Sequence, residues 1–530
     1  MTMAQDFRDE LASITSEASN TYDQLIGPVA EMLNGLHNEN FSRKYWEILV
    51  GPWLRSFSFV YSDRKTGLRS GRYPSEPNGI ITSISLEVSQ NFHDYMKSVE
   101  TTVWNEKFLS TLLIGVSNVI PSMPQVASRG TSGQPKSPFR RVTLKSLGVW
   151  NRIFGPHQRS VFIATYLPLV DDIKAQLRMA QVPTSHLQSV TTWSTSTVNT
   201  SWRGEVTDDE LLGLIRLYIP RSYVEDYQLL RRDPRLRDFS KNPKIIFTSN
   251  AFWFDDVFKG YMAAASEAGA RIVIGQHGGV FGTAEHSASE DHQLEIADRF
   301  ISYGWTRAGF ESKILQVGNF KTSGLTLHRS PKPTKALVVL TAAPSYPRFA
   351  TGGPMTDSEW RTYVSQQVDF VQKLKDEARS KILLRLKPNA FGLDQVAPWN
   401  GVVPESSMNL GVGGLDRLLG ESELVIVTYE GTTHLDTLLL GIPTVLLLDR
   451  NIWPLREEAR PLYELLEAAK ILFYDSHKAA EHVQEILTTG VEQWWSSEAT
   501  QATVRDFCQV FSARISNVPR EIAATLRALV

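Results

Sequence analysis

Short apolar runs alternate with longer amphipathic stretches along most of the 530-residue chain. Residues 245–247 (IIF) and 271–274 (RIVI) are β-rich runs typical of buried parallel strands. Between them, residues 257–268 have the spacing of a helix, which Gly269 ends. The pattern therefore predicts a β-α-β unit whose second strand runs directly into a glycine-flanked histidine, His277.

The same alternation begins again after residue 335. Strands are predicted at 336–340, 381–386, 424–427 and 444–448, with helices at about 357–378 and 432–440. Strands that alternate with helices indicate a parallel, doubly wound sheet. A Pro- and Lys-bearing stretch at 327–335, LHRSPKPTK, precedes this half and is the best domain boundary in the chain.

The remaining stretches are mostly helical in pattern. Residues 4–36 predict one or two helices, and residues 45–54 predict a dense apolar helix that Gly51-Pro52 breaks. Residues 121–141 are rich in Pro, Ser and Gly and predict an exposed loop. We therefore divide the chain into an N-terminal α/β domain with a helical extension (1–326), a second α/β domain (327–500) and a C-terminal helix (501–530).

Composition and charge exclude several classes of protein. The net charge of −2, without a dense Lys/Arg block, argues against a nucleic-acid partner. Cys508 is the single cysteine, which excludes an internal disulfide and a cysteine-rich zinc site. The polar N-terminus lacks the features of a signal peptide, and no apolar run reaches the roughly 18–20 residues that span a bilayer. We expect a cytoplasmic protein, with peripheral contact at the inner face of the cell membrane left open.

The first candidate site surrounds His277. Ligands of open α/β sheets lie at the carboxyl ends of the strands, which is where His277 is expected. The loop that carries Asp255 and Asp256 leaves the same edge of the sheet, so a histidine and one or two carboxylates would face one crevice. Such groups suit acid–base or nucleophilic chemistry, although the two acids would equally well cap the following helix. The neighbours expected to bind substrate are Gln276, Gly278 and Gly279.

The second candidate site follows the strand at 424–427. Thr432 and Thr433 are expected at the start of a helix, where free backbone N–H groups and hydroxyls can bind a phosphate or simply cap the helix. Arg385 and Lys387, at the end of a neighbouring strand, would add positive charge. The other residues expected to contact a nucleotide are Tyr429, Glu430 and Asp436, with Glu430 and Asp436 on ribose hydroxyls.

Several common activities lack their motifs. There is no Walker-type glycine loop and no tight GxGxxG after a strand, which disfavours kinases, ATPases and dehydrogenases. His277, His286 and His292 lack a zinc-binding spacing, so we predict no metal site. No cofactor is expected beyond a co-substrate.

Four stretches carry a resemblance to a known family. They are KYWEILVGPWL at 44–54, FDDVFKGYMAAASEAGARIVIGQHGGVFG at 254–282, ISYGW at 301–305 and TYEGTTHLDTLLLGIPT at 428–444. In these the chain resembles a family of bacterial transferases from surface-polysaccharide gene clusters. More remotely it is similar to GT-B transferases that use CMP-linked Kdo or sialic acids, and to CDP-glycerol glycerophosphotransferases.

This resemblance implies a fold and a function. The fold would be α/β and GT-B-like, with two Rossmann-like domains facing a central cleft and additional N-terminal helices. The protein would be a metal-independent glycosyltransferase that moves a sugar from a nucleotide-sugar donor, for which a CMP-linked 2-keto sugar is one candidate. The acceptor would be a lipid-linked or surface glycan in the assembly of lipopolysaccharide O-antigen, capsule or a related polysaccharide. Two alternatives stay open: a CDP-polyol phosphotransferase, and a non-catalytic scaffold.

Overall fold

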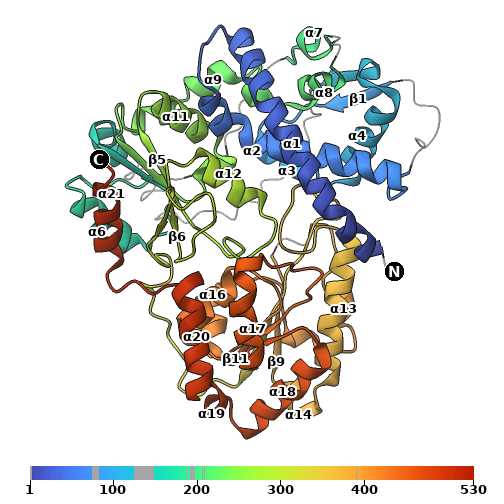
Figure 1. Ribbon diagram of the computed structural model, residues 1–530, viewed down its shortest axis with the longest axis vertical. Helices are drawn as coiled ribbons and strands as arrows, with labels where there is room; N and C mark the ends of the chain where they lie inside the picture. The colour runs from blue at the N-terminus through green and yellow to red at the C-terminus, as the bar shows by residue number, and fades with distance from the viewer. Residues whose placement is uncertain are drawn as a thin grey trace.

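The computed structural model describes two α/β domains that meet along a cleft (Figure 1). It describes residues 3–74, 83–123, 149–186, 188–190, 197–205, 207, 209–388 and 391–530, with only the backbone for residues 3–7. The predicted loop at 121–141 lies, from residue 124 onward, outside the described residues. The upper domain in Figure 1 is the N-terminal half of the chain and the lower domain is the C-terminal half.

The N-terminal domain is built on a parallel sheet in the order β3-β4-β5-β6-β7. Its strands are almost wholly buried because helices cover both faces, which is why they read as continuous apolar runs. The strands are β3 (Ser160–Ile163), β4 (Ile245–Thr248), β5 (Arg271–Gly275), β6 (Arg299–Ser302) and β7 (Ile314–Gln316). A small separate sheet pairs β1 (Ile84–Glu87) with β2 (Val119–Ser122).

Most of the helices of this domain precede or connect these strands. They are α1 (Met3–His37), α2 (Arg43–Ser70), α3 (Phe92–Ser98), α4 (Thr102–Ile114), α6 (Leu169–Arg178), α7 (Thr200–Arg203), α8 (Glu210–Tyr218), α9 (Tyr227–Arg231), α10 (Ala251–Phe254), α11 (Asp256–Glu267) and α12 (Ala288–Ile296). The predicted β-α-β unit is confirmed as β4, α11 and β5, with α10 as a short extra turn before α11.

The predicted break of the apolar helix at Gly51-Pro52 is wrong. Helix α2 continues through Pro52, although proline removes one backbone hydrogen bond of the helix. Every residue from 48 to 54 is buried, and a side chain on Gly51 would come within 2.9 Å of the His292 ring in α12. Close packing on both sides of Pro52 therefore holds the helix together across the lost bond.

The C-terminal domain contains a parallel sheet in the order β10-β9-β8-β11-β12-β13. The order reverses between β8 and β11, so this pair is the switch point at which doubly wound folds bind ligands. The strands are β8 (Lys335–Val339), β9 (Ile382–Arg385), β10 (Met408–Asn409), β11 (Ser422–Val427), β12 (Thr444–Leu447) and β13 (Leu472–Phe473). The helices are α13 (Asp357–Lys373), α14 (Asp376–Ser380), α15 (Leu415–Glu421), α16 (Thr432–Leu439), α17 (Arg460–Ala468), α18 (Ser476–Thr489), α19 (Val491–Trp495) and α20 (Glu498–Phe511).

The chain passes between the domains twice. The first crossing follows β7 and leads to β8; the second follows α20 and leads to α21 (Val518–Arg527), which packs on α6 of the N-terminal domain (Figure 1). The two crossings are bonded to each other, since Asn319 N donates to Ala513 O (2.8 Å) and Ile515 N to Ser323 Oγ (2.9 Å). Two Rossmann-like domains with a cavity between them, and with added N-terminal helices, are the GT-B-like fold that the sequence predicts.

Candidate functional site

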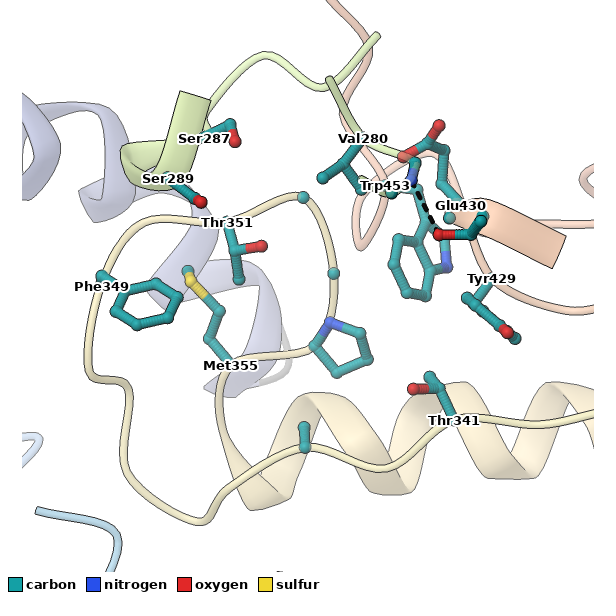
Figure 2. Close-up of a pocket in the computed structure, with 18 of the residues that line it drawn as sticks. Val280, Ser287, Ser289, Thr341, Phe349, Thr351, Met355, Tyr429, Glu430 and Trp453 are labelled. Atoms are coloured by element: carbon teal, nitrogen blue, oxygen red, sulfur yellow. Dashed lines mark hydrogen bonds between the residues drawn. The ribbon is translucent and has the colours of Figure 1, made fainter. Parts of the chain in front are cut away.

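A cavity of about 620 Å³ lies where the carboxyl ends of the two sheets face each other (Figure 2). The N-terminal domain contributes the loops after β3 and β5 and the turn after β7. The C-terminal domain contributes the loops after β8, β9, β11 and β12, including both sides of the switch point. Among the lining residues are Tyr166, His277, Gly278, Gly279, Ser287, Lys321, Thr341, Arg348, Lys387, Tyr429, Glu430, Thr432 and Trp453.

The loop after β5 is held from within by Gln276. Its buried amide group donates to Gly278 O (2.8 Å) and accepts from Tyr303 N (2.9 Å) and Trp305 Nε1 (2.8 Å). Gln276 does not line the cavity, so its expected contact with substrate is replaced by a structural role. These bonds fix the backbone on which the neighbouring His277 is presented to the cavity.

His277 lines the cavity as the sequence predicts. Burial lowers the pKa of its imidazole to about 4, with a smaller opposing effect from the backbone of Ser249. At neutral pH the ring is therefore uncharged. Its Nδ1 atom has no hydrogen-bond partner among the described residues. A neutral imidazole with an unused nitrogen at a cavity wall can accept a proton from a bound hydroxyl group.

The two domains touch where the predicted phosphate site begins. Gly279 N donates to the Thr432 hydroxyl across the cleft (2.9 Å), and a side chain on Gly279 would lie 2.0 Å from the Gly431 carbonyl carbon. Glycine is thus required at residue 279 for the close approach of the two loops. The hydroxyl of Thr433 instead bonds to the Tyr429 hydroxyl (2.6 Å), so only Thr432 of the two threonines lines the cavity.

The structure separates the two cations expected at the end of β9. Arg385 is turned away from the cavity and bonds to Val412 O and Gly413 O (2.9 Å each), because these carbonyls of a neighbouring loop need donors. Its expected contact with phosphate is therefore not what the structure shows. Lys387 does line the cavity, and its Nζ lies 3.5 Å from Thr341 Oγ1 and 3.4 Å from Ala342 O.

Lys387 has no acidic partner among the described residues. Burial, and to a lesser degree the nearby Arg348, lower the pKa of Lys387. Arg348 lines the same cavity and is paired with Glu100 of the N-terminal domain. A half-buried cation without a counter-charge is stabilised when an anion binds beside it, so this corner of the cavity favours a phosphate or carboxylate.

Glu430 is a buried carboxyl group that also lines the cavity. Its Oε1 accepts from Thr283 Oγ1 of the N-terminal domain (2.7 Å) and from the Tyr463 hydroxyl (3.0 Å). Burial raises its pKa to about 7, against the smaller effects of these neutral donors. Glu430 therefore changes charge near physiological pH.

Asp255 and Asp256 lie outside the cavity, contrary to the expectation that one of them faces it. Asp255 accepts from Arg235 (3.1 Å to Nη1) and caps α11 by accepting from Phe258 N (3.1 Å). Asp256 is paired with the fully buried Lys259 (2.6 Å). Both acids are bound to partners within the N-terminal domain. Their position after a strand in the sequence does not reveal these partners.

Asp436 also has a different partner from the expected ribose. It accepts from Lys321 (2.9 Å) and from Thr322 Oγ1 (2.6 Å), both in the turn that follows β7. Asp436 does not line the cavity but ties α16 to the N-terminal domain, whereas Lys321 lines the cavity and was not predicted. Trp453 was also missed, although its place after β12 follows the rule that identified His277.

The described part of the chain has two features that bear on partners. No group of His, Cys, Asp and Glu side chains in it has the arrangement that holds a metal ion. None of its helices is both long and apolar enough to cross a membrane.

The sequence as a whole matches one protein family. A family described as the LIC12162 family transferase matches residues 2–526. The chain belongs to the LIC12162 transferase family. It is therefore a transferase, and the predicted resemblance to a transferase family is confirmed. No curated protein matches the sequence.

Some solved structures are weakly similar to this family member. The wall teichoic acid polymerase TagF is 10% identical, with 74% of this chain and 95% of that chain covered and a TM-score of 0.34. MurG of Acinetobacter baumannii is 11% identical, with 70% and 99% covered and a TM-score of 0.35. WaaG, a glycosyltransferase involved in lipopolysaccharide biosynthesis, is 11% identical, with 69% and 99% covered and a TM-score of 0.30. The fold assignment rests on the two sheets and the cavity between their carboxyl ends.

Proposed function

We propose that this LIC12162 family transferase moves a sugar from a nucleotide-activated donor to a glycan acceptor. One observation carries the proposal. A single cavity joins a neutral His277 from one domain to Lys387, a cation without an acidic partner in the described chain, from the other. Transfer of a sugar from a nucleotide needs these two functions: a base for the acceptor hydroxyl and a positive charge for the departing phosphate.

In this proposal the donor binds on the C-terminal domain. Its phosphate lies beside Lys387 and Thr341 at the switch point, and its sugar extends towards His277. His277 takes the proton of the acceptor hydroxyl, and the phosphate leaves as its charge is balanced by Lys387 without a need for a metal ion. A bound phosphate would also raise the pKa of His277 and make it a better base.

The finer identity of the substrates is part of the proposal. A CMP-linked 2-keto sugar fits the anion-binding corner because it would bring a carboxylate as well as a phosphate to Lys387 and Arg348. The acceptor in this proposal is a lipid-linked or surface glycan of the O-antigen or capsule type, reached at the membrane surface from the cytoplasm.

Thermal shift with nucleotides tests the donor site. We expect one of CMP, CDP, UDP, GDP or ADP to raise the melting temperature selectively, since a ligand stabilises the folded state that binds it. Lys387→Met should weaken that shift, while Lys375→Met, an exposed control on the same domain, should not. A shift with CMP supports the 2-keto sugar donor, and a shift with UDP or GDP replaces that donor. No shift with any nucleotide argues for a scaffold.

Substitution of His277 tests the chemistry. With the donor that the thermal shift identifies, His277→Ala should lower the transfer rate by about 10²- to 10⁴-fold, the usual contribution of a general base. His157→Ala, an exposed histidine of the same domain, should leave the rate unchanged. Full activity of folded His277→Ala would remove His277 from the mechanism. A product that gains phosphorus would identify a polyol phosphotransferase instead.

A further inference from the structure

One wall of the cavity belongs to the C-terminal domain by sequence but is held by the N-terminal domain. This wall, residues 344–355, lies between β8 and α13 and supplies much of the cavity lining. Four of its backbone carbonyls accept from donors of the other domain: Pro347 O from Arg64, Arg348 O from Ser56 Oγ, Ala350 O from Ala288 N and Gly353 O from Arg8.

Among these donors, Arg8 forms the most hydrogen bonds to the C-terminal domain. It lies near the start of α1, and Figure 1 shows this end of the helix reaching down to α13. Its side chain is only 7% exposed and is paired with Glu359, whose side chain is fully buried. Its Nη2 donates to Gly353 O (2.5 Å) and to Ile452 O (3.2 Å). Arg8 therefore bonds to loops that follow two different strands, β8 and β12.

Both loops present cavity-lining residues beside the atoms that Arg8 contacts. Gly353 lines the cavity, and Trp453 follows Ile452 directly and also lines it. The two loops are in close contact, since a side chain on Gly353 would meet the Trp453 ring at 2.7 Å. Glu359 extends the same network because it accepts from Met355 N (2.9 Å), a further lining residue.

The surroundings of Arg8 make the arrangement stable. Leu11 and Ile14 of α1 pack in one buried cluster with Ala350 and Met355 of the wall. The cluster fixes the helix on the wall and excludes water from the ion pair. A buried charge pair with several hydrogen bonds is costly to break, so the position of α1 determines the position of both loops.

We propose that Arg8 is a positioning residue for the donor site: from the first helix of the chain, it sets the relative placement of Gly353 and Trp453. The sign of the effect on donor affinity rests on the proposed function, but the placement itself can be tested without any ligand. Arg8→Gln removes the charge and leaves one donor nitrogen in place of the three of the guanidinium. Arg8→Lys keeps the pairing with Glu359 but cannot bond to both carbonyls in the planar geometry of a guanidinium.

Hydrogen exchange of the ligand-free protein is the first test. In Arg8→Gln we expect amides of residues 350–356 and 450–454 to exchange about tenfold faster, while amides of β8 keep their rates. Arg8→Lys should lie between, and Arg43→Gln, an exposed arginine of α2, should match the unaltered protein. Unchanged exchange in the two loops, or an equal increase throughout the domain, overturns the proposal. Should Arg8→Gln not fold, Arg8→Lys carries the same test.

Donor binding is the second test. With the nucleotide that stabilises the unaltered protein, Arg8→Gln should weaken binding about tenfold, and turnover at saturating donor should change little. Lower turnover with unchanged affinity overturns the positioning role. If no nucleotide binds the unaltered protein, the proposed function fails, and the exchange experiment alone decides the role of Arg8.

Discussion

Asp256 and Glu430 are both acids that closely follow a buried parallel strand, yet their surroundings differ in the charge of their partners. Asp256 accepts from the Lys259 ammonium (2.6 Å), Ser222 Oγ (2.7 Å) and the Tyr223 hydroxyl (3.0 Å). Glu430 accepts from the neutral hydroxyl groups of Thr283 and Tyr463 and lines the cavity. A charged partner fixes the first acid as part of the core, whereas neutral partners leave the second able to change its charge.

The comparison separates two uses of a buried carboxyl group. Burial lowers the pKa of Lys259, and the nearby Asp256 opposes that shift, so the two charges depend on each other. Burial raises the pKa of Glu430 to about 7, and the smaller opposing effects come from neutral hydrogen-bond donors. An acid at a strand end is therefore a candidate site residue only if it is not paired with a buried cation.

The largest expected effect on stability is at Asp256, the acid paired with Lys259. Asp256→Asn leaves the Lys259 ammonium buried without a counter-charge, which typically costs about 3–5 kcal/mol of the free energy of unfolding. Urea denaturation of the variant measures the loss. Asp376→Asn, an exposed acid at the start of α14, is the control and should have no effect. A loss below about 1 kcal/mol would show that the pair is not essential, and the contrast with Glu430 would disappear.

The second expected effect, that of Glu430→Gln, is an increase in the free energy of unfolding. The folded-state pKa of Glu430 lies above that of an exposed glutamate, so the stability linked to its proton is complete at low pH and is lost as pH rises to about 7. At pH 8 the folded protein must bury the ionised carboxylate. Glu430→Gln, which is always neutral, should then raise the free energy of unfolding by about 2 kcal/mol.

The pH dependence is the control for this variant. The gain from Glu430→Gln should shrink between pH 8 and pH 5, because the carboxyl group of the unaltered protein becomes protonated in the folded state over that range. Melting temperatures of both proteins at several pH values measure the difference. A constant difference at every pH would mean that packing, not charge, causes the gain.

The smallest expected effect is on Asp255, the acid that directly precedes Asp256 in the sequence. Asp255→Asn should cost about 1 kcal/mol, because asparagine can still accept from Phe258 N as a helix cap. Its cation, Arg235, is 29% exposed and can be hydrated when the charge is removed. Urea denaturation beside Asp256→Asn gives the comparison directly. Equal losses of the free energy of unfolding in Asp255→Asn and Asp256→Asn would show that burial of the cationic partner does not affect the cost.

Much of the fold could be predicted from the sequence because buried parallel strands are continuous apolar runs. The strands around residues 245–248, 271–275, 336–339 and 424–427 were all predicted from such runs. The shorter β10 and β13, with two residues each, are too brief to give a pattern. The helix through Pro52 was predicted to break because its tertiary packing is invisible in the sequence.

The candidate site was predictable only where position along a strand decides it. His277, Lys387 and Thr432 follow strands and line the cavity. Asp255, Asp256, Arg385 and Asp436 have equally suitable positions in the sequence, but partners from distant segments hold them elsewhere. Arg8 could not be found at all, since it lies more than 300 residues from the loops that it contacts.

The two bonded crossings between the domains have a mechanical consequence. Two domains joined by a single flexible segment can both swing and twist relative to each other. Here two connecting segments are hydrogen-bonded side by side, residue 319 to residue 513 and residue 323 to residue 515. Such a pair permits rotation about one axis and resists twisting. We therefore expect any opening of the two halves to follow a single path, so that the same residues face each other across the cavity each time the domains close.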